Sequence, residues 1–143
     1  GELELLAGFN FNEGAPLSTV LKAAYSATID RATGLLSVAV PGFIPANYID
    51  APGAASHVRL VAAGASINFE AGTYETVTSQ SAEIELVNTE VAAIALNNQL
   101  TANSTHPLFL VLGIEFMQAV NGTPYPLRDK SFNALAIVAV SGV

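Results

Sequence analysis

The stretch that decides the fold reads Pro107-Leu-Phe-Leu-Val-Leu-Gly-Ile-Glu-Phe-Met-Gln-Ala-Val120, then a polar turn region, then Ser131-Phe-Asn-Ala-Leu-Ala-Ile-Val-Ala-Val140. Both halves are apolar runs rich in residues that favour strands, so we predict two long strands joined by a loop at the centre of the fold. The apolar run from Leu108 to Ile114 is far shorter than the roughly 20 residues of a membrane helix, and membrane insertion is not expected.

The rest of the chain has the pattern of short strands separated by turns. Segments 25–30 and 35–40 alternate on either side of Arg31-Ala32-Thr33-Gly34, which is typical of a hairpin whose glycine takes a positive φ. Segment 15–24 has helical spacing but is short and contains a proline, so we expect one helical turn or an irregular crossing. Prolines at 41, 45 and 52 favour a loop whose apolar residues plug one end of the core. Further strands are expected over 2–11, 57–69 with a break at Gly64, 73–78, 83–86 and 94–100.

This pattern predicts a single all-β domain over residues 1–143. Many short strands, glycine, proline and asparagine between them, and no long helix indicate an antiparallel β-sandwich, immunoglobulin-like or fibronectin-like, with about 7–9 strands.

The last two strands differ from the others because both of their faces are apolar. Alternation places one set on the first face: Leu108, Leu110, Leu112, Ile114 and Phe116. In the second strand Phe132, Ala134, Ala136, Val138 and Val140 are expected to oppose Leu135, Ile137 and Ala139. At roughly 25 cal/mol per Å², an exposed second face would cost several kcal/mol. Segment 15–24, the proline loop or another subunit could cover it. We favour another subunit, with the interface formed by Phe109, Val111, Leu135 and Ile137.

The composition is unusually poor in charge. Charged residues make up 12% of the chain against 51% hydrophobic residues, and the net charge is −7. The small number of cations excludes a basic face for nucleic acid. A chain with little charge and many alanines suits a surface that is partly buried by copies of itself, although an ordinary alanine-rich domain has the same composition.

No catalytic constellation is evident. There are no cysteines, so thiol chemistry and cysteine-ligated zinc are excluded, and no metal or cofactor is expected. His57 and His106 lack carboxylates at ligand spacing. An enzyme would need Asp50, Glu70 and Glu115 to converge. We expect instead that Glu115 marks the point where its strand enters water.

Two surface features have alternative interpretations. The cluster Arg128-Asp129-Lys130 falls at the expected hairpin tip, either as a solvated tip or as an intersubunit salt-bridge site. Tyr48, Tyr74 and Tyr125 lie near loops and could stack on sugars, although the chain lacks tryptophan, the commonest platform for a sugar ring.

The chain resembles a family of uncharacterised bacterial proteins over almost its whole length. The resemblance is carried by segments 1–6, 30–34, 43–47 and 57–69, and most strongly by Thr105-His-Pro-Leu-Phe-Leu-Val-Leu-Gly-Ile-Glu-Phe116, Tyr125-Pro126-Leu127 and Asn133-Ala-Leu-Ala-Ile-Val138. It implies a coherent C-terminal domain of a longer precursor, preceded by a basic segment. It assigns no activity and no site residues.

These observations predict a non-enzymatic structural protein that self-associates into a homo-oligomeric or filamentous assembly. An extracellular or cell-surface location is favoured, and copies of the chain itself are the expected partners. The alternative is a module that binds carbohydrate or another surface ligand through the three tyrosines.

Overall fold

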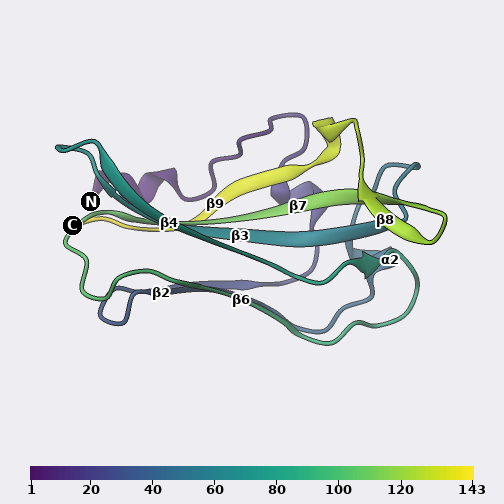
Figure 1. Ribbon diagram of the computed structural model, residues 1–143, viewed down its shortest axis with the longest axis horizontal. Coiled ribbons are helices and arrows are strands. Elements are labelled where there is room, and N and C mark those ends of the chain that lie inside the picture. The colour runs from purple at the N-terminus through teal and green to yellow at the C-terminus, as the bar shows by residue number, and fades with distance from the viewer.

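The computed structural model describes residues 1–143 and contains two antiparallel sheets packed face to face (Figure 1). The predicted antiparallel β-sandwich is confirmed, and its nine strands fall within the expected range. None of the helices is long and apolar enough to span a membrane.

The strands are β1 (Ser26–Asp30), β2 (Leu35–Val40), β3 (His57–Asn68), β4 (Thr73–Gln80), β5 (Ile84–Glu85), β6 (Ile94–Gln99), β7 (Leu108–Val120), β8 (Thr123–Pro126) and β9 (Ala134–Ser141). The helices are short: η1 (Glu2–Leu6), α1 (Leu17–Val20), α2 (Pro45–Tyr48) and η2 (Lys130–Phe132). The expected helical turn within segment 15–24 is therefore confirmed as α1.

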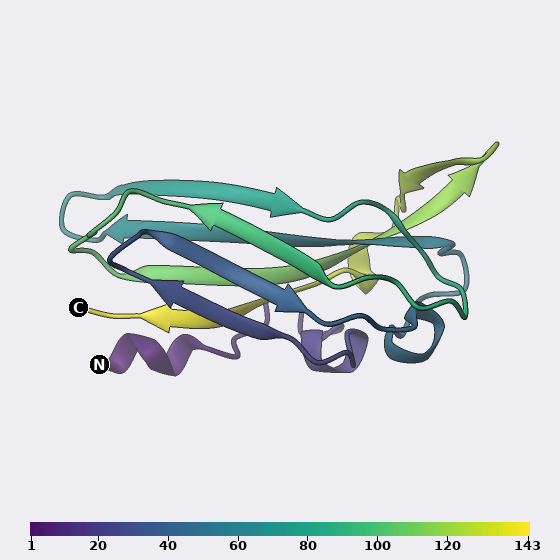
Figure 2. The same ribbon diagram turned by 90° about the horizontal axis from the view of Figure 1, so that it is seen from below.

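The large sheet has the order β4-β3-β7, with β9 and β8 on the other side of β7 and β5 on the end of β3 (Figure 2). The small sheet has the order β1-β2-β6. Strand β7 pairs with β3 along one side and with β9 along the other, which confirms the predicted central position of β7. Strand β9 pairs with β7 alone and lies at an edge of the sheet, so the prediction that both strands are central is wrong for β9.

The core fills the space between the sheets. The inward face of β7 is at most 1% exposed at every position of the predicted set: Leu108, Leu110, Leu112, Ile114 and Phe116. The small sheet opposes it with the alternating residues of β2, which the hairpin pattern had predicted: Leu36, Val38 and Val40. Phe43 and Ile49 close one end of the core, so the expected plug from the proline loop is confirmed for these two residues. Tyr48 from the same loop is 44% exposed and does not belong to the plug.

A bulge changes the predicted faces of β9. Leu110 pairs with Ala139 whereas Val111 pairs with Ile137, so Val138 is an extra residue in the ladder. Beyond the bulge, Ala139 lies opposite the inward Leu110. The predicted alternation across the whole of β9 is wrong for this reason, because a single inserted residue exchanges the two faces.

The prediction of an opening strand over 2–11 is also wrong, because the structure has no strand before Ser26. Residues 2–6 form η1, and Gly8 takes a φ of 96°, which interrupts any regular strand. The chain then runs along the outer edge of β9, with an isolated bridge between Asn10 and Ala136. Gly8 and Phe11 donate their N–H groups to Ile137 and Leu135, and the N–H of Ile137 donates to Phe9.

Gly64 does not break β3, contrary to the sequence prediction. The strand continues through it to Asn68, and the glycine faces the small sheet. A Cβ at this position would lie 3.2 Å from Cδ2 of Leu36 and 3.3 Å from Cβ of Asn98. Any larger residue would push against these two side chains, so glycine favours the close approach of the two sheets.

We expect Gly64→Val to lower the free energy of unfolding by about 2 kcal/mol, because the added methyl groups overpack the core. Denaturant unfolding measures the change. Gly53→Val is the matched control, since a Cβ at Gly53 meets no atom within 4 Å, and its effect should stay within about 0.5 kcal/mol. Equal effects of the two substitutions would contradict this account of Gly64.

Candidate functional site

The outer face of the large sheet is the side turned away from the small sheet. Cross-strand registers arrange its side chains in rows. Three successive rows contain no charged residue, and we call them the outer strip. Each row has one residue from β4, β3, β7 and β9, in that order. The rows are Thr76, Ala65, Phe109 and Val140; Thr78, Ala63, Val111 and Ile137; and Gln80, Val61, Gly113 and Leu135. The strip is thus an uncharged surface four strands wide.

The four residues predicted as an interface all lie in this strip, but their exposure differs. Phe109 and Ile137 are each 8% exposed, Val111 is half-buried and Leu135 is 36% exposed. The ring of Phe69 packs edge-on against Phe109, with 6.3 Å between the ring centroids. Part of the second apolar face is therefore covered by the chain itself.

The outer edge of β9 is covered by the N-terminal segment, which the sequence did not suggest as a cover. The N-terminal residues, first η1 and then 8–11, lie beside β9 in both views (Figures 1 and 2). Segment 15–24 was expected to be a possible cover, but Leu17, Val20 and Leu21 are 3–6% exposed and belong to the core.

Gly113 lies in the row of the strip that is next to Glu115 on β7, where no room is left for a side chain. A Cβ there would lie 2.8 Å from both the carbonyl oxygen of Ala134 and Cδ1 of Leu135, and 3.1 Å from Cγ2 of Val61. These neighbours close over the glycine, and no larger residue fits without a backbone shift.

An ion pair between Arg59 and Glu115 marks one end of the strip. The two side chains are 21% and 24% exposed, and Nε of Arg59 is buried without a hydrogen-bond partner. The expectation that Glu115 marks the entry of its strand into water is wrong, because the next two residues, Phe116 and Met117, are buried.

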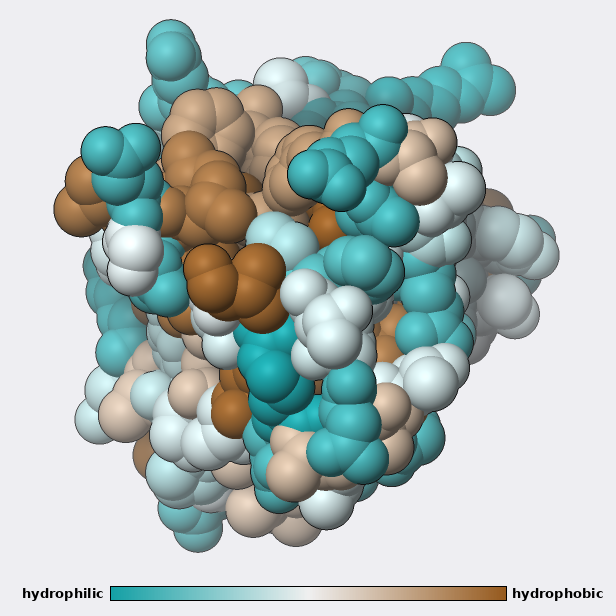
Figure 3. Space-filling model, turned by 90° about the vertical axis from the view of Figure 1, so that its left-hand side faces the viewer, coloured by the Kyte–Doolittle hydropathy of each residue, from teal (hydrophilic) through white to brown (hydrophobic).

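The end of the sandwich that carries both termini is also apolar. Leu5, Phe69 and Val143 are 83%, 62% and 79% exposed, and hydrophobic side chains gather in the upper part of this end (Figure 3). Apolar surface thus extends beyond the outer strip to this end of the large sheet.

Arg31 holds this end together, a role that the sequence analysis missed. Its Nη1 donates to the carbonyl oxygens of Ser104 and His106 at 2.9 and 2.6 Å. Its Nη2 donates to the carbonyl oxygen of Ser141 at 2.8 Å. The residue therefore ties the β1–β2 turn to the loop before β7 and to the end of β9. Apart from the hydroxyl of Ser141, its partners are main-chain carbonyls, which leave no signal in a sequence.

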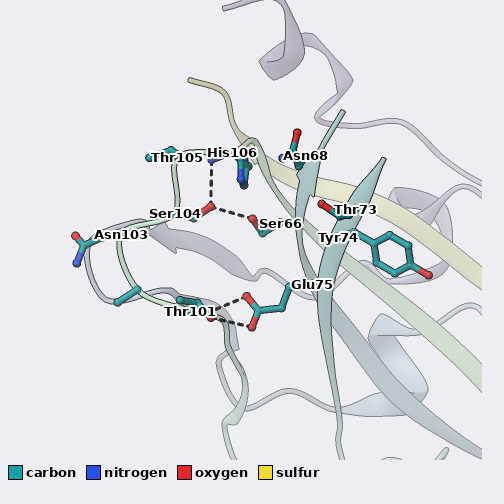
Figure 4. Close-up of a pocket in the computed structure, with 11 residues that line it drawn as sticks. Ser66, Asn68, Thr73, Tyr74, Glu75, Thr101, Asn103, Ser104, Thr105 and His106 are labelled. Carbon is teal, nitrogen blue, oxygen red and sulfur yellow. Dashed lines mark hydrogen bonds between the residues drawn. The ribbon is translucent and has the colours of Figure 1, made fainter. Parts of the chain in front are cut away.

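A polar groove of about 450 Å³ lies between the β3–β4 end and loop 101–106 (Figure 4). Its polar groups bond to one another: Glu75 accepts the N–H and the hydroxyl of Thr101, each at 3.0 Å, and the hydroxyls of Ser66 and Ser104 are 2.9 Å apart. The ring of Tyr74 points away from Glu75 (Figure 4). No aromatic platform therefore faces these polar groups.

The structure does not bring the three candidate tyrosines together. Tyr74 borders the polar groove, Tyr125 lines a depression of about 620 Å³ with Arg128 and Phe132, and Tyr48 lines a third depression. A sugar ligand would therefore meet one tyrosine at a time.

The candidate catalytic residues are likewise separate. Asp50 follows α2, Glu70 lies in the β3–β4 turn and Glu115 lies in β7, and none of the main depressions is lined by more than one of them. Nδ1 of His57 lies 2.8 Å from the hydroxyl of Ser56, which also accepts the N–H of Ala119. No group of three or more histidine, aspartate or glutamate side chains is close enough to hold a metal ion.

The charged cluster 128–130 was predicted to form a hairpin tip, and this prediction is wrong. The β7–β8 turn at Asn121 and Gly122 forms the tip, and the cluster follows β8. Asp129 caps η2 by accepting the N–H of Ser131 at 3.0 Å. Hydrogen bonds from the side chain and the backbone of Ser131 lower the pKa of Asp129.

Comparison with known proteins adds little to this description. No protein-family model and no curated protein matches the chain. A chain from a solved structure described as "pH-induced modulation of Streptococcus parasanguinis adhesion by Fap1 fimbriae" is similar, with a TM-score of 0.29 and 13% sequence identity over 82% of this chain and 76% of that chain. At so low a TM-score the similarity carries no argument about what this chain does.

Proposed function

We propose that the protein is a non-enzymatic structural subunit, a β-sandwich that self-associates into a homo-oligomeric or filamentous assembly, in an extracellular or cell-surface setting. The observation that carries the proposal is the outer strip, an uncharged and largely apolar surface across four strands of the large sheet.

Electrostatics favour this surface for contact between copies. Each copy has a net charge of −7, so two copies repel each other wherever their acidic residues meet. The outer strip contains no charged side chain, and contact there brings no like charges together. No buried ion needs to be desolvated, so the contact avoids the cost that charged interfaces carry.

Shape favours the same surface. The strip is lined by small residues at its centre, with Gly113, Ala63 and Ala65 between larger neighbours. Small side chains allow two such surfaces to approach closely, as stacked sheets do at about 10 Å. Apolar area removed from water would stabilise the contact by roughly 25 cal/mol per Å².

Light scattering over a series of protein concentrations tests self-association. We expect the mass to rise above the 14.8 kDa of one chain as the concentration increases. A mass of 14.8 kDa at every concentration would exclude the proposed function.

A further inference from the structure

Strand β4 forms an open edge of the large sheet. It pairs with β3 alone, in a regular register from Thr73 to Gln80 without a bulge, and in Figure 2 it runs along the upper side of the sandwich, where only the β7–β8 hairpin rises higher. The backbone edge opposite β3 therefore has no strand partner.

The ladder identifies the backbone groups that point out of the sheet. Ser81 donates its N–H to the carbonyl of Leu60 at 2.9 Å, so these two residues form a hydrogen-bonded pair. Hydrogen-bonded and non-bonded pairs alternate along an antiparallel ladder. The residues whose N–H and C=O groups face away from β3 are accordingly Tyr74, Thr76, Thr78 and Gln80.

Other edges of the large sheet carry protection that β4 lacks. Residues 8–11 cover the edge of β9 through main-chain hydrogen bonds, and the short β8 contains Pro124 and Pro126. Prolines, lysines, bulges and covering segments are the usual means of blocking an edge strand. The sequence of β4, Thr-Tyr-Glu-Thr-Val-Thr-Ser-Gln, contains no proline and no lysine, and nothing pairs along its edge. Its one charged residue, Glu75, is bonded to Thr101 of the same chain and does not cover the outward main-chain groups.

We propose that β4 pairs antiparallel with β4 of a second copy, so that two large sheets join edge to edge across a two-fold axis. This inference rests on the proposed self-association and names a second surface for it. Thr76, Thr78 and Gln80 contribute their side chains to the outer strip and their outward main-chain groups to the edge, so the two contacts use different atoms. Two different surfaces allow an assembly to grow beyond a dimer.

The sequence of β4 is compatible with pairing to itself. With Val77 opposite its own copy, the whole of Tyr74–Gln80 overlaps, and the outward-pointing backbone groups of one copy meet those of the other. Thr76 then lies opposite Thr78, a favourable cross-strand pair. Glu75 lies opposite Ser79, so the two carboxylates do not face each other.

Hydrogen–deuterium exchange of the intact chain tests the pairing directly. In dilute solution the amides of Thr76 and Thr78 should exchange without protection, and at concentrations where light scattering detects assembly they should become protected. The amide of Val77 points towards β3 and should be protected in both samples, as an internal control.

The possible outcomes separate this inference from the proposed function. If the mass rises with concentration while Thr76 and Thr78 stay unprotected, the edge pairing is wrong and self-association stands. If the mass stays at 14.8 kDa, both are wrong.

A variant gives a second test. Thr78→Pro removes one N–H from the open edge, where proline is tolerated in a sheet, and should abolish the edge-paired species while the circular dichroism spectrum stays that of a folded protein. Thr78→Ala retains the N–H and should associate like the unmodified chain. Equal association of both variants would overturn the edge pairing. If the proline variant does not fold, the hydrogen–deuterium exchange of the unmodified chain tests the edge pairing instead.

Discussion

Replacement of Arg31 by methionine should lower the free energy of unfolding by about 3 kcal/mol. The guanidinium donates charge-assisted hydrogen bonds to the carbonyls of Ser104, His106 and Ser141, all of which are partly buried. Methionine preserves much of the packing of the side-chain stem but leaves these carbonyls without their donor, and water replaces it only where it can reach them.

Denaturant unfolding measures this loss, and Arg128→Met provides the control. Arg128 is exposed in the connection after β8, and no hydrogen bond or ion pair involves its side chain. Its replacement should change stability by no more than about 0.5 kcal/mol. If both arginine variants unfold at the same denaturant concentration as the original chain, Arg31 does not hold the two segments in place.

Replacement of Val111 by lysine should abolish assembly through the outer strip. Val111 lies in the middle row, between Ala63 and Ile137. In a single copy the lysine side chain can extend into water. In a face-to-face contact its ammonium would be buried without a partner, at a cost of several kcal/mol. Since each 1.4 kcal/mol is a factor of ten, association should weaken by at least roughly a hundredfold.

The matched control is Val120→Lys, on the same strand and with the same change in charge. Val120 is 51% exposed and lies at the β7–β8 turn, outside the outer strip. Both variants move the net charge from −7 to −6, because each adds one positive charge. Light scattering should find assembly retained in the control and lost in Val111→Lys. Equal behaviour would exclude this strip as the contact surface.

The sequence was sufficient to predict the central strand β7 and the β1–β2 hairpin. Alternation with a period of two identifies a strand and its buried face, and Gly34, with a φ of 80°, supplies the turn that the hairpin needs. These are local properties, in which side-chain burial and backbone conformation depend on neighbouring residues.

Features that depend on distant residues were not predictable. The bulge at Val138 arises from the register between β7 and β9, and Gly64 is favoured by the proximity of Leu36 and Asn98 on the other sheet. The N-terminal segment alternates like a strand, yet its docking along β9 leaves Phe9 52% exposed. Both Gly64, which was predicted to break a strand, and the N-terminal segment, which was predicted to be a strand, are thus determined by tertiary contacts that local sequence patterns do not contain.

The candidate site was predictable only in part. The two-sided apolar pattern identified Phe109, Val111, Leu135 and Ile137, and all four lie in the outer strip. The contribution of β3 and β4 to that surface was not evident, because strand order cannot be derived from the pattern of one strand. The separation of the three tyrosines has the same cause.

Alkylation of a single thiol tests the central claim most directly, because the chain contains no cysteine of its own. Ala63→Cys places the thiol in the middle of the outer strip, and Ala95→Cys places it at an exposed position of the small sheet. If copies meet through the outer strip, alkylation at position 63 slows as the concentration rises, whereas alkylation at position 95 does not. Unchanged alkylation rates at both positions, in samples whose mass has risen, would contradict the claim.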